Sequence, residues 1–188
     1  QESRGLGDVY KRQLQNIADA QHANGAVPTT APEYVVFEGP GMDAFAESPE
    51  WGCTFVVLPF MYYETYGDDS LIRKYYNGMR RYIDYMTTRA NDGIVSFGLG
   101  DWYDYGDFRA GFSRNTPVPL VATAHYYMVV RYLVEAARML DNRYDVAYYT
   151  HLGEEINKAF HREFYHKDTR QYGTGSQCSN ALPLFLGM

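Results

Sequence analysis

Residues 116–140 read TPVPLVATAHYYMVVRYLVEAARML, and residues 142–164 read NRYDVAYYTHLGEEINKAFHREF. The first stretch is apolar on nearly every side of a helix, which predicts a buried helix. The second carries apolar residues at intervals of three and four, which predicts an amphipathic helix that covers the first from outside. Asp141 and Asn142 at the junction are typical turn residues, so the two helices are predicted to form a hairpin.

The same alternation of buried and amphipathic helices occurs elsewhere in the chain. Buried helices are predicted over 51–66 and 176–188, an amphipathic helix over 69–89, and a short helix over 14–21. The buried helices begin at residues 51, 116 and 176, so the helix pair repeats at an interval of about 60 residues. A repeat of this kind indicates an all-α array of helix hairpins, either an open solenoid or a closed toroid.

The predicted turns fall into a short and a long class. Short turns such as Gly67-Asp68 lie at one end of every helix pair, and the long loops 90–115 and 165–175 lie at the other. The amino ends of the buried helices, with their unpaired N–H groups, therefore face the same rim as the long loops. This rim is where a ligand site is expected.

Aromatic, carboxylate and amide residues collect on that rim. Gly98-Leu99-Gly100-Asp101-Trp102 combines a flexible backbone with a hydroxyl acceptor and a flat apolar wall, which is typical of a sugar-binding site. The alternative is that Trp102 fills the core and that nearby carboxylates cap helices or face solvent. The residues predicted to contact a carbohydrate are Glu50, Trp51, Asp101, Trp102 and Gln177.

Composition excludes several function classes. The 188 residues are 46% hydrophobic, which is sufficient for one folded unit, and the net charge of −6 without a basic patch argues against nucleic acid. No apolar run is long enough to span a bilayer.

Cys53 and Cys178 form neither a disulfide framework nor a metal set, so no metal and no cofactor is expected. His125 is interpreted as a core histidine. Nothing in the sequence specifies an oligomeric state or a compartment.

The first 13 residues are interpreted separately. Residues 3–13, SRGLGDVYKRQ, match the translation of a transposase sequencing adapter, so residues 1–13 are predicted to be non-native and disordered. Authentic protein is expected to start near Leu14, and both ends of the gene are expected to be missing.

A series of short motifs runs in order from Leu14 to Met188. The motifs are Ala20-Gln21, Gly25-Ala26-Val27-Pro28, Glu50-Trp51-Gly52, Leu58-Pro59, Tyr66-Gly67-Asp68, Gly98-Leu99-Gly100-Asp101-Trp102, Thr116-Pro117 and Thr174-Gly175-Ser176-Gln177. In order and spacing they resemble the six-hairpin catalytic domain of bacterial α-L-rhamnosidases. The resemblance implies a partial (α/α)6 barrel over 14–188, roughly half of a six-hairpin toroid. It also implies inverting hydrolysis of terminal α-L-rhamnose, with a rhamnose-containing carbohydrate as partner.

The resemblance also implies roles for individual residues. Trp51 and Trp102 correspond to tryptophans that line the rhamnose pocket in the family. The family's general acid lies upstream of Leu14 and its general base downstream of Met188, so no catalytic residue is expected within this chain. Gly5-Leu6-Gly7-Asp8 mimics a family motif and is assigned no function.

The carboxylates on the rim that could supply the two carboxyl groups of a glycosidase are Glu50, Asp101, Asp104 and Asp107. The three aspartates share one loop, so they are predicted to line one side of a site rather than face each other. Two other readings stay open: a non-catalytic carbohydrate-binding helical module, and another (α/α)6 carbohydrate-active enzyme of phosphorolytic or uronic-acid-processing type.

Overall fold

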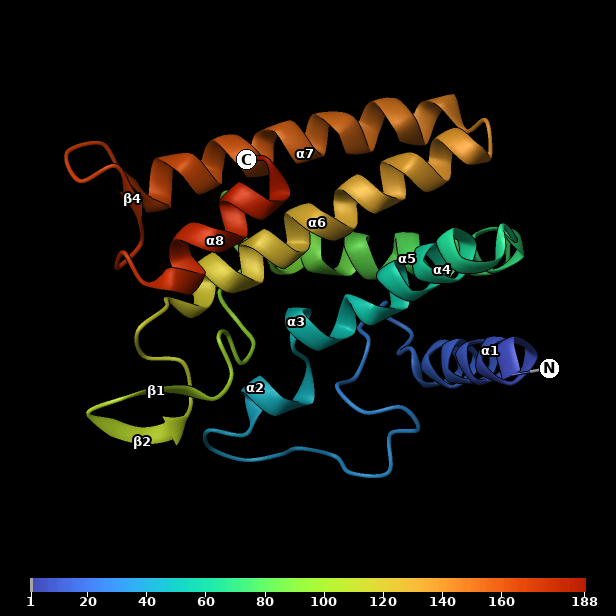
Figure 1. The fold of residues 1–188 in the computed structure, drawn as a ribbon, viewed down its shortest axis with the longest axis horizontal. Coiled ribbons are helices and arrows are strands. Elements are labelled where there is room, and N and C mark those ends of the chain that lie inside the picture. Colours follow the sequence, from blue (N-terminus) through green and yellow to red (C-terminus); the bar gives the residue numbers. More distant parts are fainter. Residues whose placement is uncertain (1) are drawn as a thin grey trace.

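The computed structural model describes residues 2–188 and is mostly helical (Figure 1). Two short antiparallel strand pairs lie in the long loops. The long helices are α1 (Glu2–Ala20), α4 (Thr54–Tyr66), α5 (Ser70–Arg89), α6 (Val118–Met139), α7 (Arg143–Phe164) and α8 (Gln177–Leu186). The short helices are α2 (Asp43–Ala46) and α3 (Pro49–Gly52), and the strands are β1 (Asp104–Gly106), β2 (Phe108–Gly111), β3 (Tyr165–His166) and β4 (Gln171–Tyr172).

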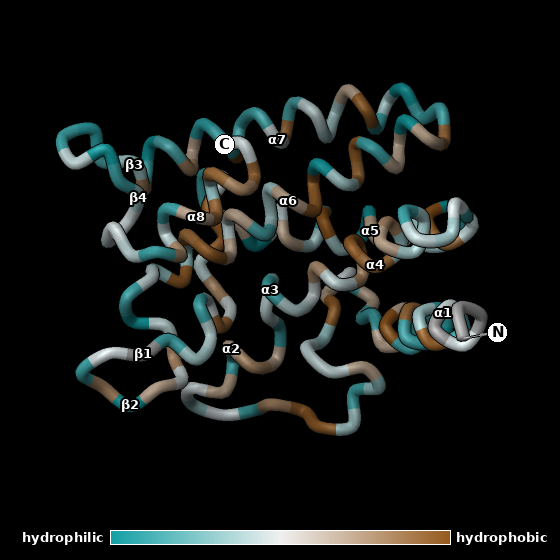
Figure 2. The backbone as a smooth tube through the Cα atoms, in the orientation of Figure 1, coloured by the Kyte–Doolittle hydropathy of each residue, from teal (hydrophilic) through white to brown (hydrophobic). Residues whose placement is uncertain are grey.

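The helices form two layers, as the repeat predicts. α6 packs against α4, α5, α7 and α8, while α1 packs against α4 and α5. Hydrophobic residues recur along α4, α6 and α8, whereas α7 carries many hydrophilic residues along its length (Figure 2). The apolar helices are therefore the inner layer, and α5 and α7 cover them from outside.

The two hairpin turns lie at the same end of the molecule (Figure 1). Gly67 ends α4 in a left-handed conformation with φ 68°, and its N–H donates to the carbonyl of Tyr63 at 2.8 Å. Asp141 turns the chain after α6 with φ 55°, and the Asn142 side chain then caps α7 by accepting from the N–H of Asp145 at 3.2 Å. The long loops emerge at the opposite end, as predicted.

The core runs continuously through the helix pairs. Its fully buried side chains include Leu14, Phe55, Ile72, Tyr126 and Ile156, which come from five different long helices. A second cluster joins α6, α7 and α8 through residues that include Leu120, Phe160 and Leu186. Among residues 2–188, no helix combines the length and the apolar character needed to cross a membrane.

The start of the chain differs from the prediction. Residues 2–13 continue the helix of α1, where disorder was expected before Leu14. Contacts with α4 account for the helical conformation: Tyr10 packs against the core, and Lys11 Nζ lies 5.5 Å from the centroid of the Tyr62 ring. The non-native origin of residues 1–13 stays a prediction.

The first inner helix and the long loops also differ in detail from the sequence-based expectation. The helix predicted over 51–66 is divided at Cys53 into α3 and α4, and α4 continues through Pro59. Strand pairs β1–β2 and β3–β4 occupy the loops between the helix pairs. Strands of two to four residues are too short to produce a recognisable period in the sequence.

Candidate functional site

The loop that carries Asp101 and Trp102 is held by α3. Oε1 of Glu50 accepts from the N–H of Gly100 at 3.1 Å, and the Ser48 hydroxyl donates to Oε2 of Glu50. The same hydroxyl accepts from the N–H of Leu99 at 3.1 Å. Gly98 adopts φ 120°, and a Cβ added there would lie 2.7 Å from Oε2 of Glu50. Glu50 is therefore placed as a brace for the loop, in addition to the sugar contact predicted for it.

Asp101 connects this loop to the start of α8. Its Oδ2 accepts from the Thr116 hydroxyl at 3.2 Å, and that hydroxyl lies 2.8 Å from Oγ of Ser176, the residue that caps α8. The thiol of Cys178 lies beside the Asp101 carboxylate. Burial and this negative charge raise the pKa of Cys178 to about 11. The loop that carries Asp101, the segment before α6 and the start of α8 thus meet at Asp101.

Asp104 is buried, and its carboxylate accepts hydrogen bonds from Arg114 and Asn115. It accepts from the N–H of Arg114 at 2.9 Å, the N–H of Asn115 at 2.6 Å and the side-chain amide of Asn115 at 2.8 Å. Burial raises the pKa of this carboxyl, but the donors outweigh burial and hold the pKa below its ordinary value. Asp104 therefore fixes the base of the β1–β2 hairpin and is poorly suited to donate a proton.

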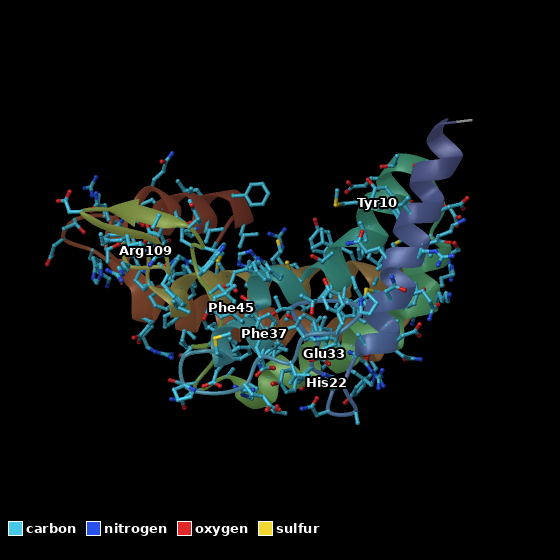
Figure 3. The ribbon with its side chains drawn as sticks, turned by 90° about the horizontal axis from the view of Figure 1, so that it is seen from below. Tyr10, His22, Glu33, Phe37, Phe45 and Arg109 are labelled. Atoms are coloured by element: carbon cyan, nitrogen blue, oxygen red, sulfur yellow. The ribbon has the colours of Figure 1, made fainter. Side chains whose placement is uncertain are left out.

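Trp102 belongs to an exposed aromatic cluster. Its ring lies edge-on to Phe45 and to Phe112, with centroid distances of 5.3 and 5.5 Å. Phe45 also packs at 5.7 Å against Phe37, and Figure 3 shows these two phenylalanines next to each other. Trp102 is 37% exposed, so part of the indole surface is available to a ligand.

The other two predicted contact residues belong to α3 and α8. Trp51 is 39% exposed and lines a pocket of about 140 Å³ with Val27, Pro28 and Thr29. The Thr29 hydroxyl is enclosed, and within residues 2–188 it has no hydrogen-bond partner. Gln177 is the first residue of α8, is exposed, and precedes the cysteine that contacts Asp101.

Sequence reasoning missed the phenylalanines and a second brace. Phe37, Phe45 and Phe112 lie in or beside loops, where the sequence has no period to assign their neighbours. The Glu47 carboxylate accepts from the hydroxyl of Tyr85 and from Arg89, which anchors the end of α2 to α5. Aromatic residues concentrated over 34–45 are the only sequence signal of this surface.

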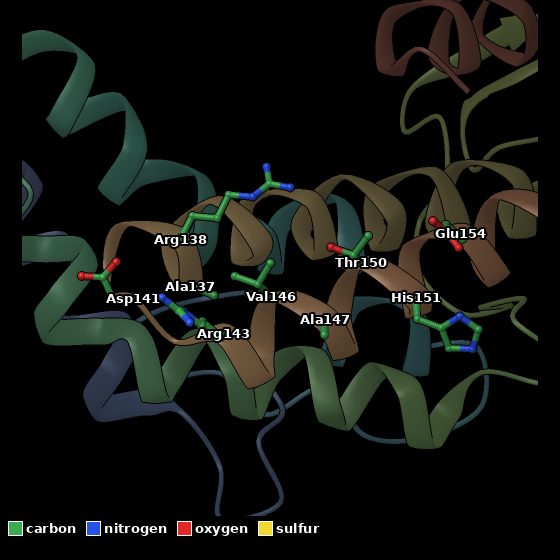
Figure 4. A pocket seen from close by; sticks show the side chains of 9 residues that line it. All are labelled: Ala137, Arg138, Asp141, Arg143, Val146, Ala147, Thr150, His151 and Glu154. Atoms are coloured by element: carbon green, nitrogen blue, oxygen red, sulfur yellow. The ribbon is translucent and has the colours of Figure 1, made fainter.

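Other candidate chemistry does not gather at this end. His125 was expected in the core but is only partly buried, and its Nδ1 lies 2.8 Å from the carbonyl of Val121 on the same helix. Within the described chain no group of histidine, cysteine and carboxylate side chains is suited to a metal ion. A hollow of about 620 Å³ lies between α6 and α7 beside their short turn, away from the long loops (Figure 4).

The family model for the bacterial α-L-rhamnosidase six-hairpin glycosidase domain matches residues 3–188. The chain belongs to this family. The solved α-L-rhamnosidase from Dictyoglumus thermophilum superimposes with a TM-score of 0.82 and 27% identity, over 95% of this chain and 19% of that one. The arrangement of helix hairpins is therefore part of a six-hairpin domain, as the motifs predicted.

Other relatives of the six-hairpin domain agree. An α-L-rhamnosidase of Formosa agariphila is 24% identical over 94% of this chain and 19% of its own length. A Streptomyces avermitilis α-L-rhamnosidase, whose structure was solved in complex with L-rhamnose, superimposes with a TM-score of 0.78 at 24% identity, over 94% of this chain and 16% of that one. The chain thus spans about a fifth of the length of its relatives, and it forms part of a glycoside hydrolase domain.

Proposed function

We propose that the protein containing this chain removes terminal α-L-rhamnose from glycosides or glycans by inverting hydrolysis. The chain supplies one wall of the sugar pocket, through Trp51, Asp101 and Trp102, with Glu50 and Gln177 beside them. The catalytic acid and base come from outside residues 14–188. The observation that carries the proposal is the pairing of Asp101 with the exposed ring of Trp102 on a loop braced by α3.

The chemistry of this pair suits a sugar. An ionised carboxylate has about four lone-pair positions. The Thr116 hydroxyl donates to the Asp101 carboxylate, and the Cys178 thiol lies beside it. Lone pairs therefore remain for substrate hydroxyls. The exposed part of the Trp102 ring offers an apolar surface for the carbon-bound hydrogens of a pyranose. The L-rhamnose complex of the Streptomyces avermitilis relative supports this class of ligand.

The remaining carboxylates of the rim do not resemble a catalytic pair. An inverting pair needs a general acid with a raised pKa and a base about 6.5–9.5 Å away. Both oxygens of Glu50 accept hydrogen bonds, and the pKa of Asp104 is lowered. Asp107 is exposed between β1 and β2. This arrangement supports a binding wall without a proton donor.

The test uses the complete protein and nitrophenyl α-L-rhamnoside as substrate. Trp102→Ala should lower kcat/KM at least about tenfold, and Asp101→Asn should act in the same direction, because both contacts strengthen in the transition state. Tyr103→Ala, an exposed neighbour outside the aromatic cluster, serves as the matched control. An unchanged rate for Trp102→Ala would return this residue to a packing role.

Two further outcomes separate the alternatives. The 188-residue chain alone should show no turnover, and measurable hydrolysis by it would contradict the placement of the acid and base outside it. A complete protein that binds L-rhamnose without cleaving any rhamnoside would instead be a carbohydrate-binding module. Cleavage of uronides with no action on rhamnosides would favour a different (α/α)6 enzyme.

A further inference from the structure

A second pocket lies on the outer layer, between α5 and α7. Its volume is about 430 Å³, within the range of about 300–1,000 Å³ that is typical of small-molecule sites. Neither helix contributes any of the residues assigned to the sugar site at the long loops. The residues that line the pocket include Arg80, Asp84 and Thr88 of α5 and Tyr144, Tyr148 and Tyr149 of α7.

Three tyrosines of α7, two exposed and one buried, line one side of this pocket. Tyr144 and Tyr148 are four residues apart on α7, which places them on the same helix face. Their rings are parallel within 7°, with centroids 6.4 Å apart, and the residues are 77% and 47% exposed. Tyr149 is buried and lies edge-on to Tyr148 at 4.9 Å. The ring of Tyr148 is thus held between Tyr149 and Tyr144, and both Tyr144 and Tyr148 keep exposed surface.

A negatively charged and a positively charged side chain, Asp84 and Arg80, line the pocket beside the tyrosines. Oδ1 of Asp84 accepts from the hydroxyl of Tyr149 at 2.7 Å, and the exposed carboxylate has further lone pairs. The Arg80 guanidinium is 43% exposed and forms an ion pair with the buried Asp145, at 3.8 Å from Oδ2. Nε of Arg80 is enclosed and, within residues 2–188, has no hydrogen-bond partner, so the donors that a ligand could reach are the exposed terminal N–H groups. The pocket therefore offers an acceptor at Asp84 and a donor at Arg80.

The charges of the side chains that line the pocket disfavour an anionic ligand. Asp145 is buried and accepts from the hydroxyl of Tyr76 at 2.6 Å and from the amide of Asn142 at 2.8 Å. With Asp84 it contributes two carboxylates against the single guanidinium of Arg80, so an anionic ligand is disfavoured. Adjacent donors and acceptors beside flat apolar rings match neighbouring hydroxyls and the carbon-bound hydrogens of a sugar.

We infer that the pocket between α5 and α7 is a second carbohydrate-binding site, which takes one neutral sugar unit against Tyr144 and Tyr148. Arg80 and Asp84 hold its hydroxyls. The inference depends on the outer layer alone and does not require that the long-loop site binds rhamnose. A second site of this kind would hold another part of a polymeric substrate, or a neighbouring chain of it, on the outside of the domain.

Ligand-observed NMR with the 188-residue chain tests the inference. The probes are methyl α-L-rhamnoside, methyl β-D-galactoside and methyl β-D-glucoside, each titrated separately. At least one probe should bind saturably, and Tyr144→Ala combined with Tyr148→Ala should weaken that binding at least about tenfold. Tyr144→Phe should retain it, because the ring surface and not the hydroxyl makes the contact. Tyr34→Ala, which removes an 80% exposed tyrosine on another segment, is the control.

Trp102→Ala separates the two sites in the same experiment. Binding that survives Trp102→Ala and is lost on changing Tyr144 and Tyr148 supports the inference. Arg80→Gln should weaken it as well, since the guanidinium donates to a hydroxyl. The inference is overturned if no probe binds saturably, or if binding disappears with Trp102→Ala and is unaffected by the two tyrosine substitutions. Tyr144 is 77% and Tyr148 47% exposed, so the circular dichroism spectrum of the double variant should match that of the parent chain.

Discussion

The backbone N–H of Gly100 donates a 3.1 Å hydrogen bond to Oε1 of Glu50, a residue fifty positions earlier in the chain. Ser48 adds a second connection between the same segments through the N–H of Leu99. The shape of the loop that carries Trp102 is therefore set by the start of an inner helix hairpin, and not by the loop sequence alone.

Removal of the Glu50 carboxylate should destabilise this loop. Glu50→Ala leaves the N–H of Gly100 without its acceptor, so the free energy of unfolding should fall by about 1–3 kcal/mol. Urea denaturation followed by circular dichroism measures the difference. Glu64→Ala, which changes an exposed glutamate on α4, should stay within about 0.5 kcal/mol of the parent chain. Equal losses for the two variants would show that Glu50 braces nothing.

Substitution of Gly98 tests how closely the loop approaches α3. Gly98→Ala places a Cβ 2.7 Å from Oε2 of Glu50 and 2.8 Å from Cδ of Pro49, whereas a Cβ at Gly39 meets nothing within 4 Å. Both glycines have positive φ, 120° and 105°, so the conformational penalty is shared. Gly98→Ala should therefore lower the thermal midpoint more than Gly39→Ala. The reverse order in differential scanning calorimetry would contradict the described contact.

Asp104 should give the protein a pH-dependent contribution to stability. Its pKa in the folded state is lowered relative to an unfolded value of about 4, so its stabilising effect is complete above that value and declines as the pH falls through the folded pKa. Asp104→Asn should thus unfold more easily than the parent chain at neutral pH, and the gap should narrow below about pH 4. Asp107→Asn, at an exposed position, is the control. A gap that is constant with pH would show that the charge of Asp104 makes no contribution.

The rate at which the Cys178 thiol is alkylated should depend on the nearby Asp101 carboxylate. Burial and the Asp101 charge raise its pKa from 9.0 to about 11, so at pH 8.5 the thiolate fraction should be about a hundredfold lower than in the unfolded chain. Alkylation by iodoacetamide should be slow, and Asp101→Asn should accelerate it.

Peptide mass spectrometry distinguishes Cys178 from Cys53 in that experiment. The pKa of Cys53 is raised to about 12, mainly by burial, so its labelling should not respond to Asp101→Asn. If Cys178 is labelled at the same rate in both proteins, the loop and α8 do not meet at Asp101.

The sequence predicts the helices well because their packing repeats locally. The amphipathic spacing over 69–89 and 142–164 reproduces α5 and α7 to within a residue, since an apolar face has to recur every three to four positions. The turn at Gly67 follows from its left-handed conformation. Residue type and position along the chain were sufficient for these elements.

Contacts between loops could not be predicted from local sequence periodicity. Phe45 and Phe112 meet Trp102 from segments on either side of it, and no local period connects them. The sequence indicated that Glu50 and Asp101 lie on one rim, but not that Glu50 bonds to the backbone of the loop. Such pairings depend on where separate segments are brought by the helix layers.

The β1–β2 hairpin is fixed at one end and open at the other. Asp104 ties its base to Arg114 and Asn115, while Asp107 and Arg109 are exposed. Added residues between Asp107 and Arg109 would lengthen the tip at a small entropic penalty, about 0.6 kcal/mol for each doubling of a flexible loop. Members of the family can therefore differ in the surface next to Trp102 while Trp102 itself keeps its place.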